Sequence, residues 1–395
     1  MLLLSRVAIA EKLDWLKTGE ISYRPAYQIS NQPIVDPQGN ILSYTDFYGR
    51  LYGLFKLQKS INDLRFVSQL RPRFDYTNSE TFLNIGVDEF YADYKINQTV
   101  FVSLGKRNIF NGVGLGYNFT DYFGENKKVD NTLKAEYIRD QRVGDYMATV
   151  EWFLDSSSLA VYFAPRIQSI QDSQSRLLLR YNKLFQEWNT DVTGYLFMGQ
   201  IPGLGLNFSN TINDNWIVYS ELSLRKNRDR NIQNTTNNTN NNIFVNMLIG
   251  TNYTFTNDIS LYLEYWHQGS GFDKTEWNNI LNATEIYSNQ LNTMDLPSGN
   301  AGLGQINSSL RSRFLRQNYL FSRVSYPVGQ NLDLSLVHIL NLDDTSQFIR
   351  ALVEKEFADK YYVAFQVEQM LGHYDQEFAM RNWSTNVTLT FKVSF

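Results

Sequence analysis

Cysteine is absent from the 395-residue sequence, and histidine occurs only three times, at His267, His338 and His373. The lack of cysteine excludes disulfide frameworks, cysteine-ligated zinc sites and thiol catalysis. The histidines do not have the spacing of a zinc-binding helix motif, so no metal or other cofactor is expected. Lys+Arg total 36 and Asp+Glu total 40, and the resulting net charge of −4 gives no basic excess for nucleic acid. Apolar runs of about 18 residues are also lacking, so no transmembrane helix is expected.

Aromatic residues, by contrast, are abundant. The chain has 26 Phe, 25 Tyr and 7 Trp, together 15% of its residues, although its mean hydropathy is −0.36. Soluble domains rarely combine a polar mean hydropathy with so high a content of aromatic residues. It is typical of a membrane barrel, in which only every second strand residue faces lipid and aromatic side chains gather at both interfaces.

Apolar and polar residues alternate with a period of two in many parts of the chain. In residues 64–76, one face is mainly apolar and the opposite face carries Arg65, Arg71 and Arg73. Because an α-helix repeats about every 3.6 residues, this alternation predicts β-strands. We count about 18 such segments, within a range of 16 to 20, and a barrel with both chain ends on one side needs an even number. The predicted fold class is all-β, a single antiparallel transmembrane β-barrel.

The connections between these segments are of two kinds. Short polar turns occur, for example, at residues 155–158 and 256–258. Long connections cover residues 31–45, 108–130, 226–242, 270–308 and 372–383. Outer-membrane barrels have short periplasmic turns and longer extracellular loops, and the same arrangement is predicted here.

The 270–308 connection contains a helix-start pattern. Asp273 and Glu276 have the spacing of a capping box, and Trp277, Ile280 and Leu281 follow at helical spacing. The predicted helix has two interpretations. It can pack the loop against itself, or it can act as a lid over a pore.

The N-terminal segment, residues 1–18, also has two interpretations. It is either the remnant of a signal peptide, with a small-x-small site at residues 8–10, or a short amphipathic helix. Residues 19–395 are assigned to the barrel.

The last strand alternates strictly and ends on an aromatic residue. Phe391, Val393 and the terminal Phe395 share its apolar face. This strand resembles the terminal strand of bacterial outer-membrane barrels, whose final residues are read by the assembly machinery. The resemblance implies a Gram-negative outer membrane, with outer-membrane lipid and the assembly machinery as partners.

If the apolar faces point outward, charged side chains line the interior. The predicted pore-lining residues are Arg65, Arg71, Arg73, Asp93, Arg107, Arg166, Arg176, Arg180, Glu221 and Glu264. A ring of one charge sign in a water-filled pore selects by charge, so the arginines favour anions and carboxylated solutes. In the alternative interpretation, the arginines pair with interior acids across the barrel and merely rigidify the wall.

A glycine-rich stretch follows the strand that ends at Arg107. An exposed loop would not need its apolar residues, among them Ile109, Leu115 and Phe119, whereas glycines let a backbone pack closely against a wall. We therefore predict a loop near residues 108–125 that folds into the barrel and narrows the lumen. The predicted constriction-loop residues are Asn108, Asn111, Gly112, Gly114, Gly116, Asn118 and Asp121.

The same stretch carries a family resemblance. Gly105, Lys106 and Arg107, with the glycines from Gly112 onward, resemble the strand and inward loop of porin-like channels, including those of the alginate-export type. A nucleotide-binding loop does not fit, because the lysine precedes the glycines. The resemblance implies passage of a hydrophilic solute, with anions among the candidates.

Together these patterns predict an outer-membrane channel for passive passage of small hydrophilic solutes, anions among them. The alternative is a plugged barrel that acts as a scaffold or exporter component with periplasmic or surface protein partners. An enzyme is not predicted, because Ser335 and His338 lie three apart in one strand and point to opposite faces. The sequence assigns no oligomeric partner.

Overall fold

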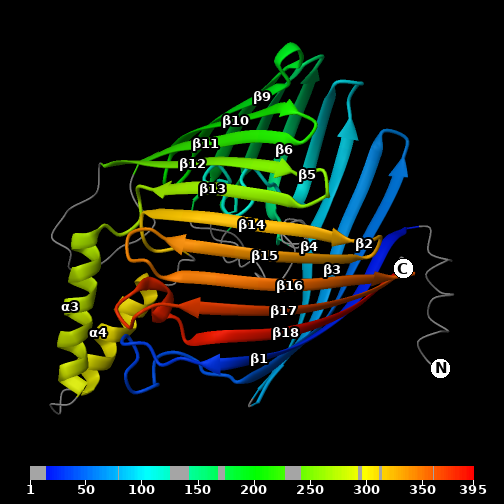
Figure 1. Cartoon of the computed structure of the whole chain (residues 1–395). Coiled ribbons are helices and arrows are strands. Elements are labelled where there is room, and N and C mark those ends of the chain that lie inside the picture. Colours follow the sequence, from blue (N-terminus) through cyan, green and yellow to red (C-terminus); the bar gives the residue numbers. More distant parts are fainter. Residues whose placement is uncertain are drawn as a thin grey trace.

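Eighteen strands follow one another around a closed antiparallel barrel (Figure 1). The computed structural model describes residues 15–78, 80–124, 142–167, 174–226, 242–291, 296–310, 314–358 and 360–395. In chain order the strands are β1 Leu16–Ser30, β2 Phe47–Ile61, β3 Leu64–Thr77, β4 Thr81–Lys95, β5 Val100–Arg107, β6 Asp145–Leu154, β7 Ser157–Ala164, β8 Arg176–Phe185, β9 Thr190–Met198, β10 Gly203–Asn213, β11 Trp216–Lys226, β12 Ile243–Thr254, β13 Ser260–Gln268, β14 Asn318–Val328, β15 Leu332–Asn341, β16 Gln347–Phe357, β17 Tyr361–Leu371 and β18 Trp383–Ser394. Each strand pairs with the next, and β18 pairs with β1. The predicted fold class and strand number are confirmed.

The alternation of the sequence appears as two faces of the barrel wall. On β18, Phe391 and Val393 are exposed, whereas Thr388 and Thr390 on the opposite face are buried. Exposed apolar side chains of this kind recur around the barrel and give it an apolar outer surface for lipid, whereas the inner face is polar on some strands and apolar on others. Among the described residues, no helix is long and apolar enough to cross a membrane.

The two ends of the barrel differ in the length of their connections. At one end the connections are residues 31–46, 78–80, 108–144, 165–175, 199–202, 227–242, 269–317, 342–346 and 372–382. The other end has only short turns, for example residues 62–63, 155–156 and 214–215. The long-loop end corresponds to the extracellular side of outer-membrane barrels.

The structure bears on the N-terminal boundary of the barrel but does not describe the segment before it. Strand β1 begins at Leu16, so the barrel starts before the boundary expected at residue 19. The two interpretations of the N-terminal segment fall mainly on residues 1–14, which lie outside the described residues.

The long connection between β13 and β14 contains the helices α3 (Lys274–Leu291) and α4 (Leu296–Ser309). The predicted capping box is present: the Asp273 backbone N–H donates to Glu276 Oε2 at 3.0 Å, and the Glu276 N–H donates to Asp273 Oδ1 at 2.8 Å. Trp277 and Ile280 are buried in a cluster that also includes Val35 from the β1–β2 loop. The helix prediction is confirmed, and the helix packs against other loops as well as its own.

The chain end completes the barrel. Phe395 exchanges two backbone hydrogen bonds of 2.8 Å with Gly19, and its ring lies over that glycine. A Cβ atom at Gly19 would come within 2.4 Å of the Phe395 ring, so any other residue there would displace the ring. The Phe395 ring is also 6.3 Å from that of Phe55 on β2, measured between centroids. The terminal residue therefore seals the junction of β18 with β1.

Deleting Phe395 is expected to lower the amount of protein in the outer membrane. Phe395 is 37% exposed, and even complete burial of a phenylalanine ring stabilises by only about 1.5–3 kcal/mol, so a loss of protein greater than this energy predicts would indicate a role in assembly. The measurement is quantitative immunoblotting of outer-membrane fractions. Phe357→Ala is the matched control, because Phe357 is an exposed aromatic near the short-turn end of β16. Equal yields of the deletion and the wild type would contradict the predicted assembly signal.

Candidate pore and its constriction loop

The loop that follows β5 is anchored to the barrel wall at its base. The Asn108 backbone N–H donates to Glu89 Oε1 on β4 at 2.8 Å. At the other end of the connection, the Gly144 N–H donates to the Asp88 carbonyl oxygen at 2.7 Å. The β3–β4 register shifts between Gln69 and the following residue, next to these anchors. Both ends of the loop are thus fixed to one irregular site on β4.

The tip of the loop is held by Glu221 on β11. One carboxylate oxygen accepts hydrogen bonds from the backbone N–H groups of Val113 at 2.6 Å and Gly114 at 3.0 Å. The other accepts from the N–H groups of Phe119 at 2.7 Å and Thr120 at 3.1 Å, and from the Thr120 hydroxyl at 3.2 Å. Glu221 itself is 1% exposed. A buried carboxylate with five donors is well compensated for the loss of water.

Glu264 on β13 provides a second anchor. Its oxygens accept hydrogen bonds from the N–H groups of Leu115 at 2.6 Å and Gly116 at 3.1 Å. The wall itself supplies two further donors, the Tyr219 hydroxyl at 2.7 Å and the Trp266 indole N–H at 2.8 Å. Glu221 and Glu264 were predicted to line the pore. They face the interior, but the loop covers them, and their carboxylates accept hydrogen bonds from the loop backbone.

The anchors show that the loop crosses the lumen. It leaves the wall at β5 and contacts it again at β11 and β13, and in the closed sheet β6–β10 lie between these positions. Residues 113–120 contact the inner side of β11 and β13, and residue 125, the end of the expected constriction loop, lies outside the described residues.

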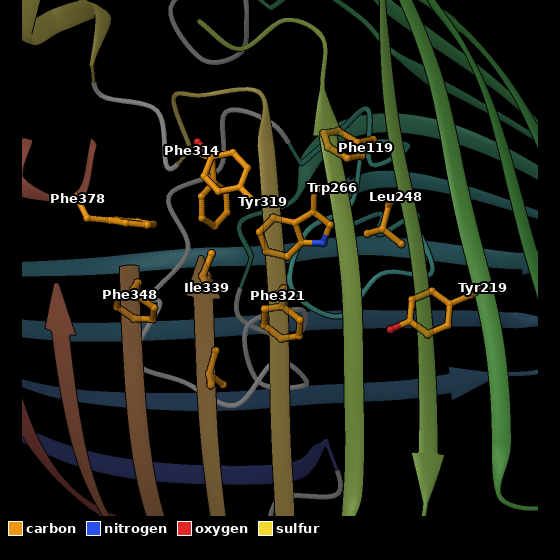
Figure 2. Close-up of a cluster of buried hydrophobic side chains, with 11 residues drawn as sticks. Phe119, Tyr219, Leu248, Trp266, Phe314, Tyr319, Phe321, Ile339, Phe348 and Phe378 are labelled. Carbon is orange, nitrogen blue, oxygen red and sulfur yellow. The ribbon is translucent and has the colours of Figure 1, made fainter. Parts of the chain in front are cut away.

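Apolar side chains of the loop pack on a stripe of apolar residues inside β11–β16. Figure 2 shows Phe119 beside this stripe, which includes Trp266 and Phe321. The glycines allow the close approach: a Cβ atom at Gly116 would lie 2.3 Å from the Trp266 ring, and one at Gly114 would lie 2.6 Å from the Leu248 side chain. Glycine is therefore required where the backbone meets the wall.

The remaining predicted loop residues hold the loop's own shape. Gly112 has a φ of +111°, a conformation that favours glycine, and the Asn118 amide lies against it. The Asn111 N–H donates to Asp121 Oδ1 at 3.3 Å. Asp121 is buried and forms an ion pair with Arg142, a residue that the sequence did not single out.

Most of the predicted pore-lining arginines form ion pairs with interior acids. The pairs are Arg65 with Asp93, Arg71 with Asp88, Arg73 with Asp75, Arg107 with Glu151, and Arg176 with Asp145. These pairs lie along the wall, on one strand or on nearby strands, rather than across the barrel as the alternative interpretation expected. Asp75 also accepts a hydrogen bond from Arg50 Nε at 2.6 Å, so two guanidinium groups share this carboxylate.

Two other predicted arginines have different surroundings. Arg180 on β8 lies over the Tyr162 ring, 5.4 Å from its centroid. Arg166 is exposed and lies beyond the end of β7, in a loop at the long-loop end. The prediction that it lines the lumen wall is therefore wrong.

The long-loop end carries a further buried carboxylate, Glu377 in the 3-10 helix η2 (Glu377–Met380). It accepts hydrogen bonds from the Leu315 N–H at 2.9 Å, the Tyr319 hydroxyl at 2.5 Å and the Asn341 amide at 2.8 Å. Burial raises the pKa of this carboxyl above its ordinary value. Glu377 thus ties the β17–β18 loop to β15 and to the connection that contains α3 and α4.

Several residues that hold the loop or its anchors were missed in the sequence, above all Glu89, Tyr219 and Trp266. One signal was available. On β11 and on β13, an inward carboxylate lies two residues from an inward aromatic donor, in the pairs Tyr219–Glu221 and Glu264–Trp266. The aromatic O–H or N–H can donate a hydrogen bond to the carboxylate, so such a pair on one face indicates a carboxylate that is buried rather than in contact with water.

The chain resembles known proteins in structure but not in sequence. No family model and no curated protein matches the chain. Pseudomonas aeruginosa OpdQ superposes with a TM-score of 0.60 at 9% identity, covering 97% of this chain and 99% of that one. Pseudomonas aeruginosa OccK11 (OpdR) gives 0.58 at 9% identity, and OccK5 (OpdH) 0.57 at 7%, each covering 96% of this chain and 97% of the other. The fold is that of the outer-membrane porins. At these identities the porin fold is all that the likeness establishes.

Proposed function

We propose that the protein is a channel of the bacterial outer membrane for passive passage of small hydrophilic solutes. The observation that carries the proposal is the pair of opposite faces of β3. Phe66 and Phe74 face outward, whereas Arg65 and Arg73 on the inner face have side chains that are 47% and 35% exposed. Charged side chains inside a closed barrel keep this exposure only where water reaches them.

A preference for anions is the finer part of the proposal. It is supported by the guanidinium groups of Arg50 and Arg73, which meet at the single carboxylate of Asp75. Pairing with acids weakens the field of the other arginines, so we expect a moderate preference. Fixed charges in a lumen with low-dielectric walls raise the local concentration of counter-ions.

A plugged barrel is the second candidate, and the observation in its favour is the loop that crosses the lumen between β5 and β11. Recording from the purified protein in a planar bilayer separates the two. We expect discrete conductance steps for the channel. Protein whose folding is shown by heat-modifiable gel mobility, but which gives no conductance, would contradict the channel and favour the plug.

A further inference from the structure

The outward face of the barrel wall carries lysines but no carboxylates. Every aspartate and glutamate of the described strands lies on the inward side of its strand. The outward face, in contrast, includes Lys59 on β2, Lys106 on β5, Lys183 on β8, Lys226 on β11 and Lys355 on β16. A lysine can lay its long apolar stem along a lipid-facing wall and bring its charge to the interface. The outer surface therefore offers positive charge without negative charge beside it on the strands.

Three of these lysines, Lys59, Lys183 and Lys355, share one position at the short-turn end. Each lies two residues before the last residue of its strand, since β2 ends at residue 61, β8 at residue 185 and β16 at residue 357. Each is paired with an apolar outward residue of the next strand: Phe66, Val192 and Val363. At a rise of about 3.3 Å per residue, the offset from the strand end is about 7 Å along the strand. The lysines thus lie just inside the periplasmic edge of the wall.

Exposed aromatic residues give the membrane depth of this edge. Trp152, Trp216 and Tyr361 are 46%, 40% and 52% exposed, and each lies at or near the short-turn end of its strand. Trp152 has the same offset from its strand end as the three lysines. Belts of Trp and Tyr sit at the level of the lipid headgroups. The headgroup region adds only about 5–7 Å to each side of the hydrocarbon core, so the lysines lie at the depth of the lipid phosphates.

Neighbouring side chains hold the ammonium groups of these lysines at the surface. Lys59 Nζ is 5.9 Å from the centroid of the Trp15 ring, and Lys355 Nζ is 5.0 Å from that of the Phe357 ring. Lys183 Nζ donates a hydrogen bond of 2.7 Å to the Ser156 hydroxyl. Contacts of an ammonium group with an aromatic ring are favourable and leave its other side open to a further partner. The positions of the charges are thus fixed by protein contacts.

We propose that Lys59, Lys183 and Lys355 bind the phosphate groups of anionic phospholipids in the periplasmic leaflet of the membrane. The complementary charge, the depth and the absence of outward carboxylates on the described strands support this partner. At least four strands separate any two of the lysines in the closed sheet, so each binds a lipid of its own. Together the three contacts hold the barrel at a fixed depth. The inference goes beyond the proposed channel function and does not depend on a solute.

Native mass spectrometry of the folded protein with phosphatidylglycerol tests the proposal, and phosphatidylethanolamine, which has no net charge, is the comparison lipid. A triple variant with Lys59→Gln, Lys183→Gln and Lys355→Gln removes the three positive charges. The matched triple variant with arginine at the same positions keeps them. Lys226→Gln is the control for position, because Lys226 is exposed at the long-loop end of β11. Folding of each variant is checked by heat-modifiable gel mobility, and the bound lipids are counted from the masses.

The wild type, the arginine triple variant and Lys226→Gln should retain phosphatidylglycerol in preference to phosphatidylethanolamine. Each lysine replaced by glutamine should weaken phosphatidylglycerol binding at its site about fivefold, and the glutamine triple variant should lose the preference. The three single glutamine variants give the same comparison if the triple variant folds poorly. Equal retention by the wild type and the glutamine variants, or an equal loss in Lys226→Gln, would overturn the proposal. Because no current is measured, the result is independent of whether the barrel conducts.

Discussion

Replacing Glu221 by alanine is expected to free the tip of the constriction loop and raise the single-channel conductance. The substitution removes the acceptor for four backbone N–H groups and one hydroxyl. Each buried donor left without a partner costs about 1–3 kcal/mol. The loop can avoid most of that cost by leaving the wall, where water satisfies its N–H groups. A wider lumen and earlier proteolytic cleavage in residues 108–124 should follow.

The corresponding change at Glu264 should have a smaller effect. Glu264 binds only two loop N–H groups, and its other donors, Tyr219 and Trp266, belong to the wall. The single-channel conductance should therefore be highest for Glu221→Ala, lower for Glu264→Ala and lowest for the wild type. Glu187→Ala is the control, because Glu187 is exposed in the turn between β8 and β9. A Glu221→Ala channel with unchanged conductance and unchanged cleavage would show that the loop is held by its apolar contacts alone.

The features that could be predicted from the sequence depend on near neighbours in the chain. Alternation with a period of two revealed the strands and their outward faces, because strand geometry puts successive side chains on opposite sides. The capping box at Asp273 and Glu276 was recognisable because the two residues bond each other. The inward loop was predicted from apolar residues such as Phe119, which need a surface to pack against.

The roles that could not be predicted depend on contacts between distant segments. Glu221 and Val113 are 108 residues apart, so the local Tyr219–Glu221 pattern can indicate that the carboxylate is buried but not which backbone groups it binds. The ion pairs of the interior arginines depend on strand register. Arg71, for example, pairs with Asp88 at the irregular site on β4, where the register with β3 shifts. A pattern of alternating residues gives the face of a side chain but not its partner across the ladder.

Replacing Arg71 and Arg73 by serine should shift the ion preference of the channel toward cations. The change removes two positive charges and also leaves the carboxylates of Asp88 and Asp75 in the lumen with fewer partners. The reversal potential in a salt gradient measures the shift. It should be largest in dilute salt, because the Debye length falls from about 10 Å at 0.1 M to about 3 Å at 1 M.

The single variant Arg73→Ser keeps this prediction testable if the double variant folds poorly. Asp88 is buried beside Arg71, and a buried carboxylate that loses its partner costs about 3–5 kcal/mol, whereas Asp75 retains Arg50. Asp75→Asn should move the preference the other way, toward anions. Arg176→Ser should shift the reversal potential least, because the Arg176 side chain is only 13% exposed and lies over the Phe123 ring. A shift for Arg176→Ser as large as that for Arg73→Ser would mean that charge throughout the lumen, rather than on the β2–β4 face, sets the selectivity.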